Sequence, residues 1–125
     1  MLVIRKEQMR ALSAYMGRSF EDRTVRHLAQ IFPQKIRNGL DPTIGDVKVR
    51  DLIRLGVKKS SGYGLKGERN VALFIDLMVG ISPGFDQLKE MSLVRAILEN
   101  AKMPEGEKMD LIYQHLQGKA AKERV

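Results

Sequence analysis

The sequence predicts an all-α fold: a compact bundle of about five helices in which the first helix is long. Apolar residues recur at steps of three and four along most of the chain, and this spacing gathers them on one face of a helix. Glycine and proline interrupt the spacing at intervals, and residues 1–4 are the one short candidate for a strand. With 125 residues, 43% of them apolar, the chain is long enough to bury a core as one domain.

The first helix is expected over residues 6–31. Its apolar stripe contains Met9, Leu12, Met16, Phe20, Val25, Leu28 and Phe32. One step of five within this stripe, with Gly17 nearby, predicts a bend in the middle of the helix. Pro33 should end the helix, because the residue before a proline avoids the helical region. Residues 33–45 contain several Gly, Pro, Asn and Asp residues and are expected to form a loop.

The second helix is expected to begin at Asp46, a candidate N-cap, and to end at the glycine-containing segment 60–64. Its apolar stripe contains Val49, Leu52, Ile53 and Val57. Gly56 lies within that stripe, where a glycine lets a neighbouring helix come close at a cost of about 1 kcal/mol in helix propensity. The third helix, expected over about 68–81, is apolar on nearly all sides except for Asp76. This composition predicts a place at the centre of the core.

Two more helices complete the predicted bundle. The first of them is expected over 92–100, and its apolar positions are Leu93, Val94, Ile97 and Leu98. The last helix begins near Pro104, because proline suits the first turn of a helix and the glutamates that follow suit the positive end of its dipole. We expect one helical domain over residues 1–118, followed by a polar C-terminal tail over 119–125.

The composition excludes several classes of protein. The chain has no cysteine, so a disulfide framework and thiolate chemistry are excluded. No segment approaches the roughly 20 apolar residues that a membrane span requires. The first residues lack the apolar stretch and the cleavage site of a signal peptide. We therefore expect a cytoplasmic protein without a membrane span.

The net charge of +7 comes entirely from the first half of the chain. Residues 1–60 carry 13 Lys and Arg against 6 Asp and Glu, whereas residues 61–125 carry 9 of each kind. The candidate partner-binding residues are the basic set of the second helix, Arg50, Arg54, Lys58 and Lys59. Such a set can bind an acidic protein or nucleic acid, or it can simply be solvated. The face has no Asn or Gln to read bases and no aromatic residue to stack on them.

We expect no catalytic, metal or cofactor site. His27 and His115 lie far apart in the sequence, and neither belongs to a spacing such as H-x-x-x-H that binds metal. His27 is interpreted as an interfacial or hydrogen-bonded histidine. The glycine-rich segment 62–67 lacks the preceding strand and the Gly-Lys-Ser/Thr ending of a phosphate-binding loop, so it is interpreted as a turn between helices.

Glu21 and Asp22 cannot form a catalytic dyad, because adjacent positions on a helix point in different directions. We interpret the two carboxylates as ion-pair partners for arginines of the same helix, Arg18, Arg23 or Arg26. Because the sequence shows no set of catalytic residues, we expect the outer surface of the protein to carry its function. The third helix is so apolar that a partner protein or a second copy of the chain is expected to cover whatever the other helices leave exposed.

Blocks along nearly the whole chain resemble a family of small bacterial helical proteins encoded near spike and effector genes of the type VI secretion system. The blocks are FEDR at 20–23, FP at 32–33, VRDLIRLG at 49–56, YG at 63–64, ERNV at 68–71, FIDLM at 74–78, FD at 85–86, RAIL at 95–98 and MDLIY at 109–113. Their order is more specific than any single block. The chain departs from the family at 82–84, where relatives often carry a charged turn, and at 93–94, where an aromatic residue is common.

The resemblance implies a non-enzymatic accessory protein of contractile secretion, acting in the bacterial cytoplasm. Its role would be that of a chaperone, adaptor or immunity protein that binds a secretion effector or a spike component. The resemblance implies no catalytic residue and no cofactor. A basic helical domain that binds nucleic acid is the alternative, and an enzyme ranks last because no catalytic constellation is visible.

Overall fold

The computed structural model describes the backbone of residues 6–37 and 49–123, and the side chains of residues 19–36 and 49–119. These described residues form helices and turns with no strand, so the prediction of an all-α fold is confirmed. The α-helices are α1 (Lys6–Ile31), α2 (Pro33–Arg37), α3 (Val49–Gly62), α4 (Glu68–Gly80), α5 (Ser92–Leu98) and α6 (Glu105–Glu123). Two 3-10 helices lie between α4 and α5: η2 (Phe85–Gln87) and η3 (Lys89–Met91).

Two helix boundaries differ from the prediction. Pro33 does not open a loop but is the first residue of α2, because its fixed φ suits the first turn of a new helix even where it ends the previous one. The last helix, α6, runs to Glu123 and therefore includes residues 119–123, which were expected in a polar tail. The expected N-cap, Asp46, lies outside the described residues. The side chains of Met9, Leu12 and Met16 and the surroundings of Gly17 also lie outside them.

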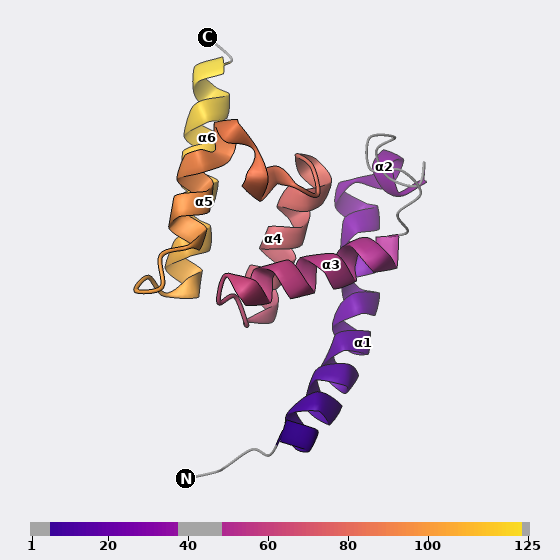
Figure 1. Ribbon diagram of the computed structural model, residues 1–125. Coiled ribbons are helices and arrows are strands. Elements are labelled where there is room, and N and C mark those ends of the chain that lie inside the picture. The colour runs from indigo at the N-terminus through magenta and orange to yellow at the C-terminus, as the bar shows by residue number, and fades with distance from the viewer. Residues whose placement is uncertain (1–5, 38–48, 124–125) are drawn as a thin grey trace.

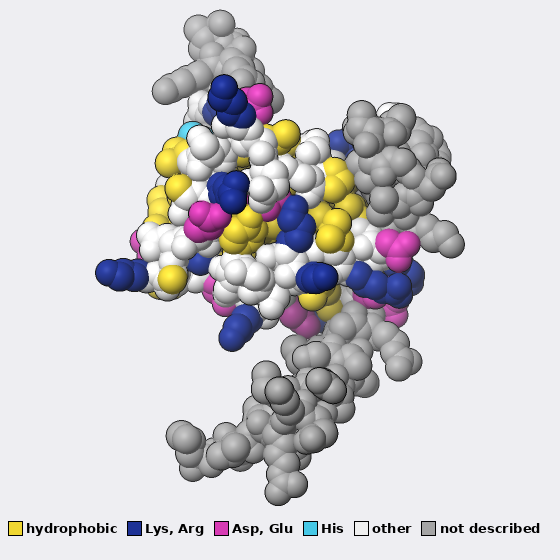
Figure 2. Space-filling model, in the orientation of Figure 1, with side chains coloured by type: hydrophobic (Ala, Val, Ile, Leu, Met, Phe, Trp, Pro, Cys, Tyr) yellow, Lys and Arg dark blue, Asp and Glu magenta, His cyan; other side chains and the backbone are white. Residues whose placement is uncertain are grey.

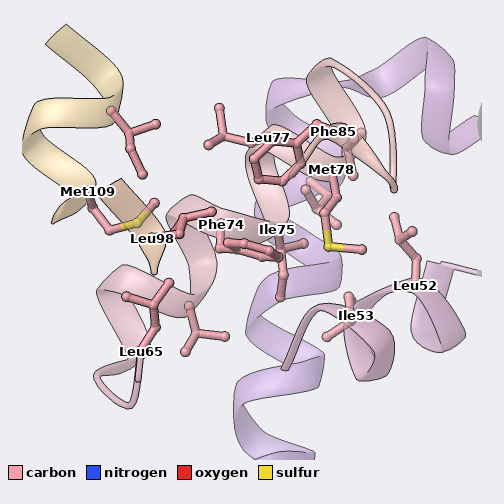
Figure 3. Packing of buried hydrophobic residues seen from close by; sticks show 14 of the residues in the cluster. Leu52, Ile53, Leu65, Phe74, Ile75, Leu77, Met78, Phe85, Leu98 and Met109 are labelled. Atoms are coloured by element: carbon pink, nitrogen blue, oxygen red, sulfur yellow. The ribbon is translucent and has the colours of Figure 1, made fainter. Parts of the chain in front are cut away.

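The helix α4 lies at the centre of the fold, between α1 on one side and α6 on the other (Figure 1). Its buried residues are Asn70, Val71, Phe74, Ile75, Leu77, Met78 and Val79. Buried apolar side chains from the other elements surround it, among them Leu52, Ile53, Leu65, Phe85, Leu98 and Met109 (Figure 3). Leu28 of α1 belongs to the same buried cluster. The central position expected for the third predicted helix is therefore confirmed.

Gly56 brings α3 close to α4, as its place in the apolar stripe predicts. A Cβ atom added at Gly56 would lie 2.5 Å from Cγ1 of Ile75 and 3.0 Å from Sδ of Met78, so no other residue fits without a shift. Two residues expected in apolar stripes, Val57 and Leu93, are instead exposed, with exposed fractions of 41% and 51%. Gly56 is the residue of α3 that faces α4. Val57 is the next residue, and adjacent positions on a helix point in different directions, so its side chain is turned away from α4.

Lys108 ties the ends of two helices to α6. Its side chain is buried, and its ammonium donates hydrogen bonds of 2.9 Å to the backbone carbonyls of Tyr63 and Leu98. These carbonyls lie just after the end of α3 and at the last residue of α5, where backbone acceptors lack helical partners and the helix dipole is negative. A single buried cation thus satisfies two helix C-termini.

Glu105, the first residue of α6, caps the start of α4. Its carboxylate accepts hydrogen bonds from the backbone N–H of Gly67 at 2.7 Å and from Nδ2 of Asn70 at 2.8 Å. The backbone N–H of Lys66 also donates to this carboxylate, at 3.2 Å. The hydrogen bonds from Asn70 and Gly67 hold the pKa of Glu105 below its ordinary value of 4.5.

Candidate functional site

Arg50 and Arg54, two of the predicted partner-binding residues, pair with α1. Nη1 of Arg50 donates to Glu21 at 3.0 Å and to Asp22 at 2.8 Å. Nε and Nη2 of Arg54 donate to the two carboxylate oxygens of Glu21, at 3.2 and 3.3 Å. Of the arginines predicted as partners on the same helix, Arg23 pairs with Glu68 instead, and the side chain of Arg18 lies outside the described residues. The partners of Glu21 and Asp22 come from α3, because α3 crosses α1 directly beside these carboxylates.

The pairing changes the electrostatics of this basic set. Burial raises the pKa of the Glu21 carboxyl, but the hydrogen bonds and charges of Arg50 and Arg54 outweigh burial and leave that pKa below its ordinary value. Asp51 also lies 3.5 Å from Arg54, so acidic side chains neutralise both arginines locally. Figure 2 shows the resulting mixture of basic and acidic side chains where α1 and α3 cross.

The other two predicted partner-binding residues, Lys58 and Lys59, differ in exposure and in hydrogen bonding. Lys58 is exposed, whereas Nζ of Lys59 donates to Oδ1 of Asp86 at 2.5 Å and to the Pro83 carbonyl at 2.9 Å. The Tyr63 hydroxyl donates to the other oxygen of Asp86 at 2.6 Å. The four basic residues therefore do not share one free surface, and Lys59 belongs to a buried polar cluster.

His27 and Asp76 are brought together across α1 and α4. Nε2 of His27 donates to both carboxylate oxygens of Asp76, at 3.0 Å each, which confirms the interpretation of His27 as a hydrogen-bonded, interfacial histidine. Burial raises the pKa of Asp76, and the hydrogen bond and charge of His27 offset only part of that rise. His115 is half-buried on α6, and no group of three or more potential metal-ligating side chains exists among the described residues.

A hollow lies on each side of the His27–Asp76 pair. The first is a cavity of about 230 Å³, lined by Phe20, Arg23, Thr24, His27, Glu68, Arg69 and Ala72. Two ion pairs involve its lining residues: Arg23 pairs with Glu68 at 2.9 Å, and Arg69 pairs with Asp110 of α6 at 3.3 Å. This end of the molecule therefore presents both signs of charge.

The second hollow is larger and mainly apolar. It is a cavity of about 670 Å³, lined by Ile31, Phe32, Asp76, Leu77, Gly80, Ile81, Met91, Tyr113, Leu116, Gln117 and Lys119. One wall comes from the end of α1 and the other from α6, while the end of α4 forms the floor. Ile31, on the α1 wall, is 49% exposed and therefore adds apolar surface at the edge of this hollow.

The two hollows line up along one face of α4, and we call them together the α4 groove. The floor residues recur every four positions, at Glu68, Ala72, Asp76 and Gly80, so they share one face of the helix. These residues are small or charged, whereas the other residues of α4 from Val71 onward are apolar. Sequence reasoning missed the groove, although this stripe was a readable signal that one face of the third helix is not packed in the core.

The polar groups of the α4 groove are already bonded within the protein. The Tyr113 hydroxyl donates to the backbone carbonyl of Leu73 at 2.7 Å, and burial, with the nearby charge of Asp76, raises the pKa of Tyr113. Lys35 donates to the carbonyl of Val79 at 2.7 Å near the end of α4. The groove therefore offers apolar surface and a fixed polar rim, which is the usual construction of a recognition surface.

Comparisons with known proteins add no identity: no protein-family model, no curated protein and no solved structure matches this chain. Among the described helices, none combines the length and the apolar character that crossing a membrane requires.

Proposed function

We propose that this chain is a non-enzymatic accessory protein that binds an amphipathic helix of another protein in the α4 groove. The observation that carries the proposal is the apolar hollow between α1 and α6, about 670 Å³ in volume, with Ile31 half exposed on its wall. Exposed apolar surface beside a concave site is typical of protein recognition rather than of an ordinary solvated face.

The shape of the groove favours a helix as the bound element. The floor follows α4, whose 13 residues span about 20 Å at the usual rise per residue. Two further helices form the walls, so a bound helix would pack against helices on three sides, as in other helix-in-groove complexes. Its apolar residues would enter the larger hollow, while its polar residues would face the charged rim near Arg23 and Arg69.

The type VI secretion context is part of this proposal. The resemblance of the ordered blocks to small proteins encoded near spike and effector genes supports it, and this resemblance makes a secretion effector or a spike component the partner to test. Within that context the chain would act as a chaperone, adaptor or immunity protein in the bacterial cytoplasm. The choice among these roles depends on which partner binds.

Nucleic-acid binding, the alternative, receives less support from the geometry. Arg50 and Arg54 would have to release Glu21 in order to contact a phosphate, and Asp22 and Asp51 would repel that phosphate. Phosphate binding by basic residues weakens steeply with salt. Titration of a labelled DNA duplex at low and high salt therefore tests the alternative, and salt-dependent binding lost in an Arg50→Gln variant would favour it over the groove.

The groove itself is tested with purified spike and effector proteins of a type VI secretion system from the same genome, each titrated by calorimetry. Binding is expected for one of them, and Ile31→Glu should weaken it at least about tenfold, because a charge would enter an apolar contact. Leu93→Glu is the matched control, since Leu93 on α5 is similarly exposed but lines neither hollow of the groove. Unchanged binding by Ile31→Glu would reject the groove, and absence of binding to every such protein would reject the secretion context.

A further inference from the structure

We infer that the larger hollow of the α4 groove receives the ammonium group of a lysine side chain, with Asp76 as the carboxylate that binds it. The inference rests on the proposed function, because the lysine belongs to the partner helix bound in the same groove. It adds the chemistry by which that helix is recognised: one lysine, with apolar residues beside it on the same face.

Asp76 is a mostly buried carboxylate that keeps its negative charge. Its side chain is 15% exposed and lines the larger hollow, which is therefore where a ligand reaches it. Nε2 of His27 donates to this carboxylate, and a neutral imidazole that donates one N–H leaves the negative charge in place. No Lys or Arg among the described residues forms an ion pair with Asp76. The hollow is thus the place where a ligand can supply the missing cation.

Asp86 shows how this protein satisfies a carboxylate that binds no ligand. It accepts hydrogen bonds from three side chains: Lys59, Tyr63 and Gln87. Within the described part of the chain, Asp76 accepts from the side chain of His27 alone. The pKa of Asp76 lies above its ordinary value, whereas the pKa of Asp86 lies below it, which reflects the same difference in donors. Because a carboxylate offers about four acceptor positions, Asp76 has acceptors left for a donor that enters the hollow.

The position of His27 favours lysine over arginine as that donor. Nε2 of His27 lies 3.0 Å from each oxygen of Asp76, so it occupies the place in front of the carboxylate, between the two oxygens. A guanidinium needs that place for its two parallel hydrogen bonds. An ammonium is a compact charge that binds a single oxygen, so it can approach from the side. The hydrogen bond that orients Asp76 therefore also selects the cation.

The rest of the hollow suits the stem of a lysine and limits the partner to one such residue. Apolar side chains such as Phe32 and Leu77 line the hollow, and a four-carbon stem packs along such surface while its ammonium reaches a polar group. Lys119 lines the same hollow from α6, about 9 Å along that helix from Tyr113, on which the charge of Asp76 acts. A second cation at that end would meet a like charge, so the partner presents one lysine, at Asp76.

Small probes that share one apolar chain test the site without any protein partner. Hexylammonium chloride, hexanol and sodium hexanoate are each titrated into the full chain at about pH 8, where histidine side chains are ordinarily neutral. NMR follows the carboxyl carbon of Asp76 and the methyl groups of Ile31. Hexylammonium is expected to bind about tenfold more tightly than hexanol, because it adds a hydrogen bond between charged groups to the same apolar contact. Equal binding of these two probes, or tighter binding of hexanoate, would overturn the inference.

Two variants that lose the same charge separate the effect of Asp76 from that of the net charge. Asp76→Asn should lower the affinity for hexylammonium to that for hexanol, and unchanged binding of hexanol shows that the hollow is still formed. Asp51→Asn is the matched control, since Asp51 lies on α3 and lines neither hollow of the groove. It should keep the tenfold preference of the unsubstituted protein. A preference that survives Asp76→Asn, or that disappears in Asp51→Asn, would overturn the inference.

The inference and the proposed function fail in different ways. If a spike or effector protein binds through Ile31 and binds Asp76→Asn equally well, the lysine is rejected and the proposed function stands. If hexylammonium binds at Asp76 but neither class of protein binds, the ammonium site stands and the proposed partner is rejected. If both hold, exchanging the contacting lysine of the partner for Glu should weaken binding at least about tenfold, and Asp76→Lys should restore part of that loss.

Discussion

The two faces of α4 differ in how closely their neighbours approach. Toward α3, the backbone at Gly56 comes so near that Ile75 and Met78 leave no space for a single added carbon. Toward α1 and α6, a stripe of small and charged residues, including Ala72, Asp76 and Gly80, forms the floor of a hollow. One helix therefore has a face packed to the density of a protein interior and a face that remains open.

Glycine has opposite effects on these two faces. Gly56 lies on the neighbouring helix α3 and allows the two backbones to close together, which removes space. Gly80 lies on α4 itself. Because glycine has no side chain, the hollow is deeper at this position, beside Phe32. The comparison indicates that the α3 face supplies stability and that the groove face is free to serve binding. The predictions that follow test this division.

The largest effect should come from truncating a side chain on the closed face. Met78→Ala is expected to lower the free energy of unfolding by about 4 kcal/mol, because a fully buried side chain leaves an unfilled cavity. Leu77→Ala, at the adjacent position on the groove face, should cost only about 2 kcal/mol, since its side chain already borders open space. Urea unfolding of both variants measures the difference, and equal losses would contradict the division.

A second contrast concerns two aspartates in the two environments. Burial raises the pKa of Asp86, but hydrogen bonds from Lys59, Tyr63 and Gln87 outweigh burial and leave that pKa below its ordinary value of 3.8. The pKa of Asp76, in contrast, lies above 3.8. Asp86 therefore adds stability above pH 3.8 that is lost as the pH falls, while ionisation of Asp76 removes stability as the pH rises through its raised pKa.

Asp86→Asn is accordingly expected to cost about 3 kcal/mol at pH 7, because it removes the charged partner of Lys59, and to cost less at low pH. Asp76→Asn should shift the pH dependence of stability in the opposite direction, with a smaller loss at pH 7 than at pH 3. Carbon-13 NMR titration of the carboxyl groups gives the two pKa values directly. Titration of Asp76 below Asp86 would contradict the assignment.

The smallest of these effects is expected from adding one carbon to α3. Gly56→Ala should destabilise the protein by about 1–2 kcal/mol, since overpacking against Ile75 exceeds the gain of about 1 kcal/mol in helix propensity. Gly62→Ala is the matched control on the same helix, because no atom lies within 4 Å of its added Cβ, and it should be neutral or slightly stabilising. Thermal unfolding distinguishes them, and a stabilised Gly56→Ala variant would show that the two helices can separate at low cost.

The sequence predicted the parts of the fold that depend on local pattern. The start of α4, its central position, the close approach at Gly56 and the hydrogen bonding of His27 all followed from spacing or residue type. The partners of Glu21 did not, because they depend on where α3 crosses α1. The turn of helix at Pro33 was missed because proline both ends one helix and begins another.

The groove was predictable only in part. The polar and small positions of the third helix marked its floor, and the excess of apolar residues around them predicted that something covers the helix. The walls were not predictable, because periodicity alone does not say which faces of α1 and α6 meet α4. The sequence pointed instead to the basic set on α3 as the partner-binding surface, although two of its four members are paired with acidic residues of α1.

The walls of the α4 groove belong to helices from opposite ends of the described chain, α1 and α6 (Figure 1). During translation, α1 and the floor of α4 emerge from the ribosome before α6 has been made. A nascent chain at that stage exposes α4 without its second wall, so the proposed binding site for a helix is not yet complete. Under the proposed function, recognition therefore begins only once the residues up to Lys119 have left the ribosome.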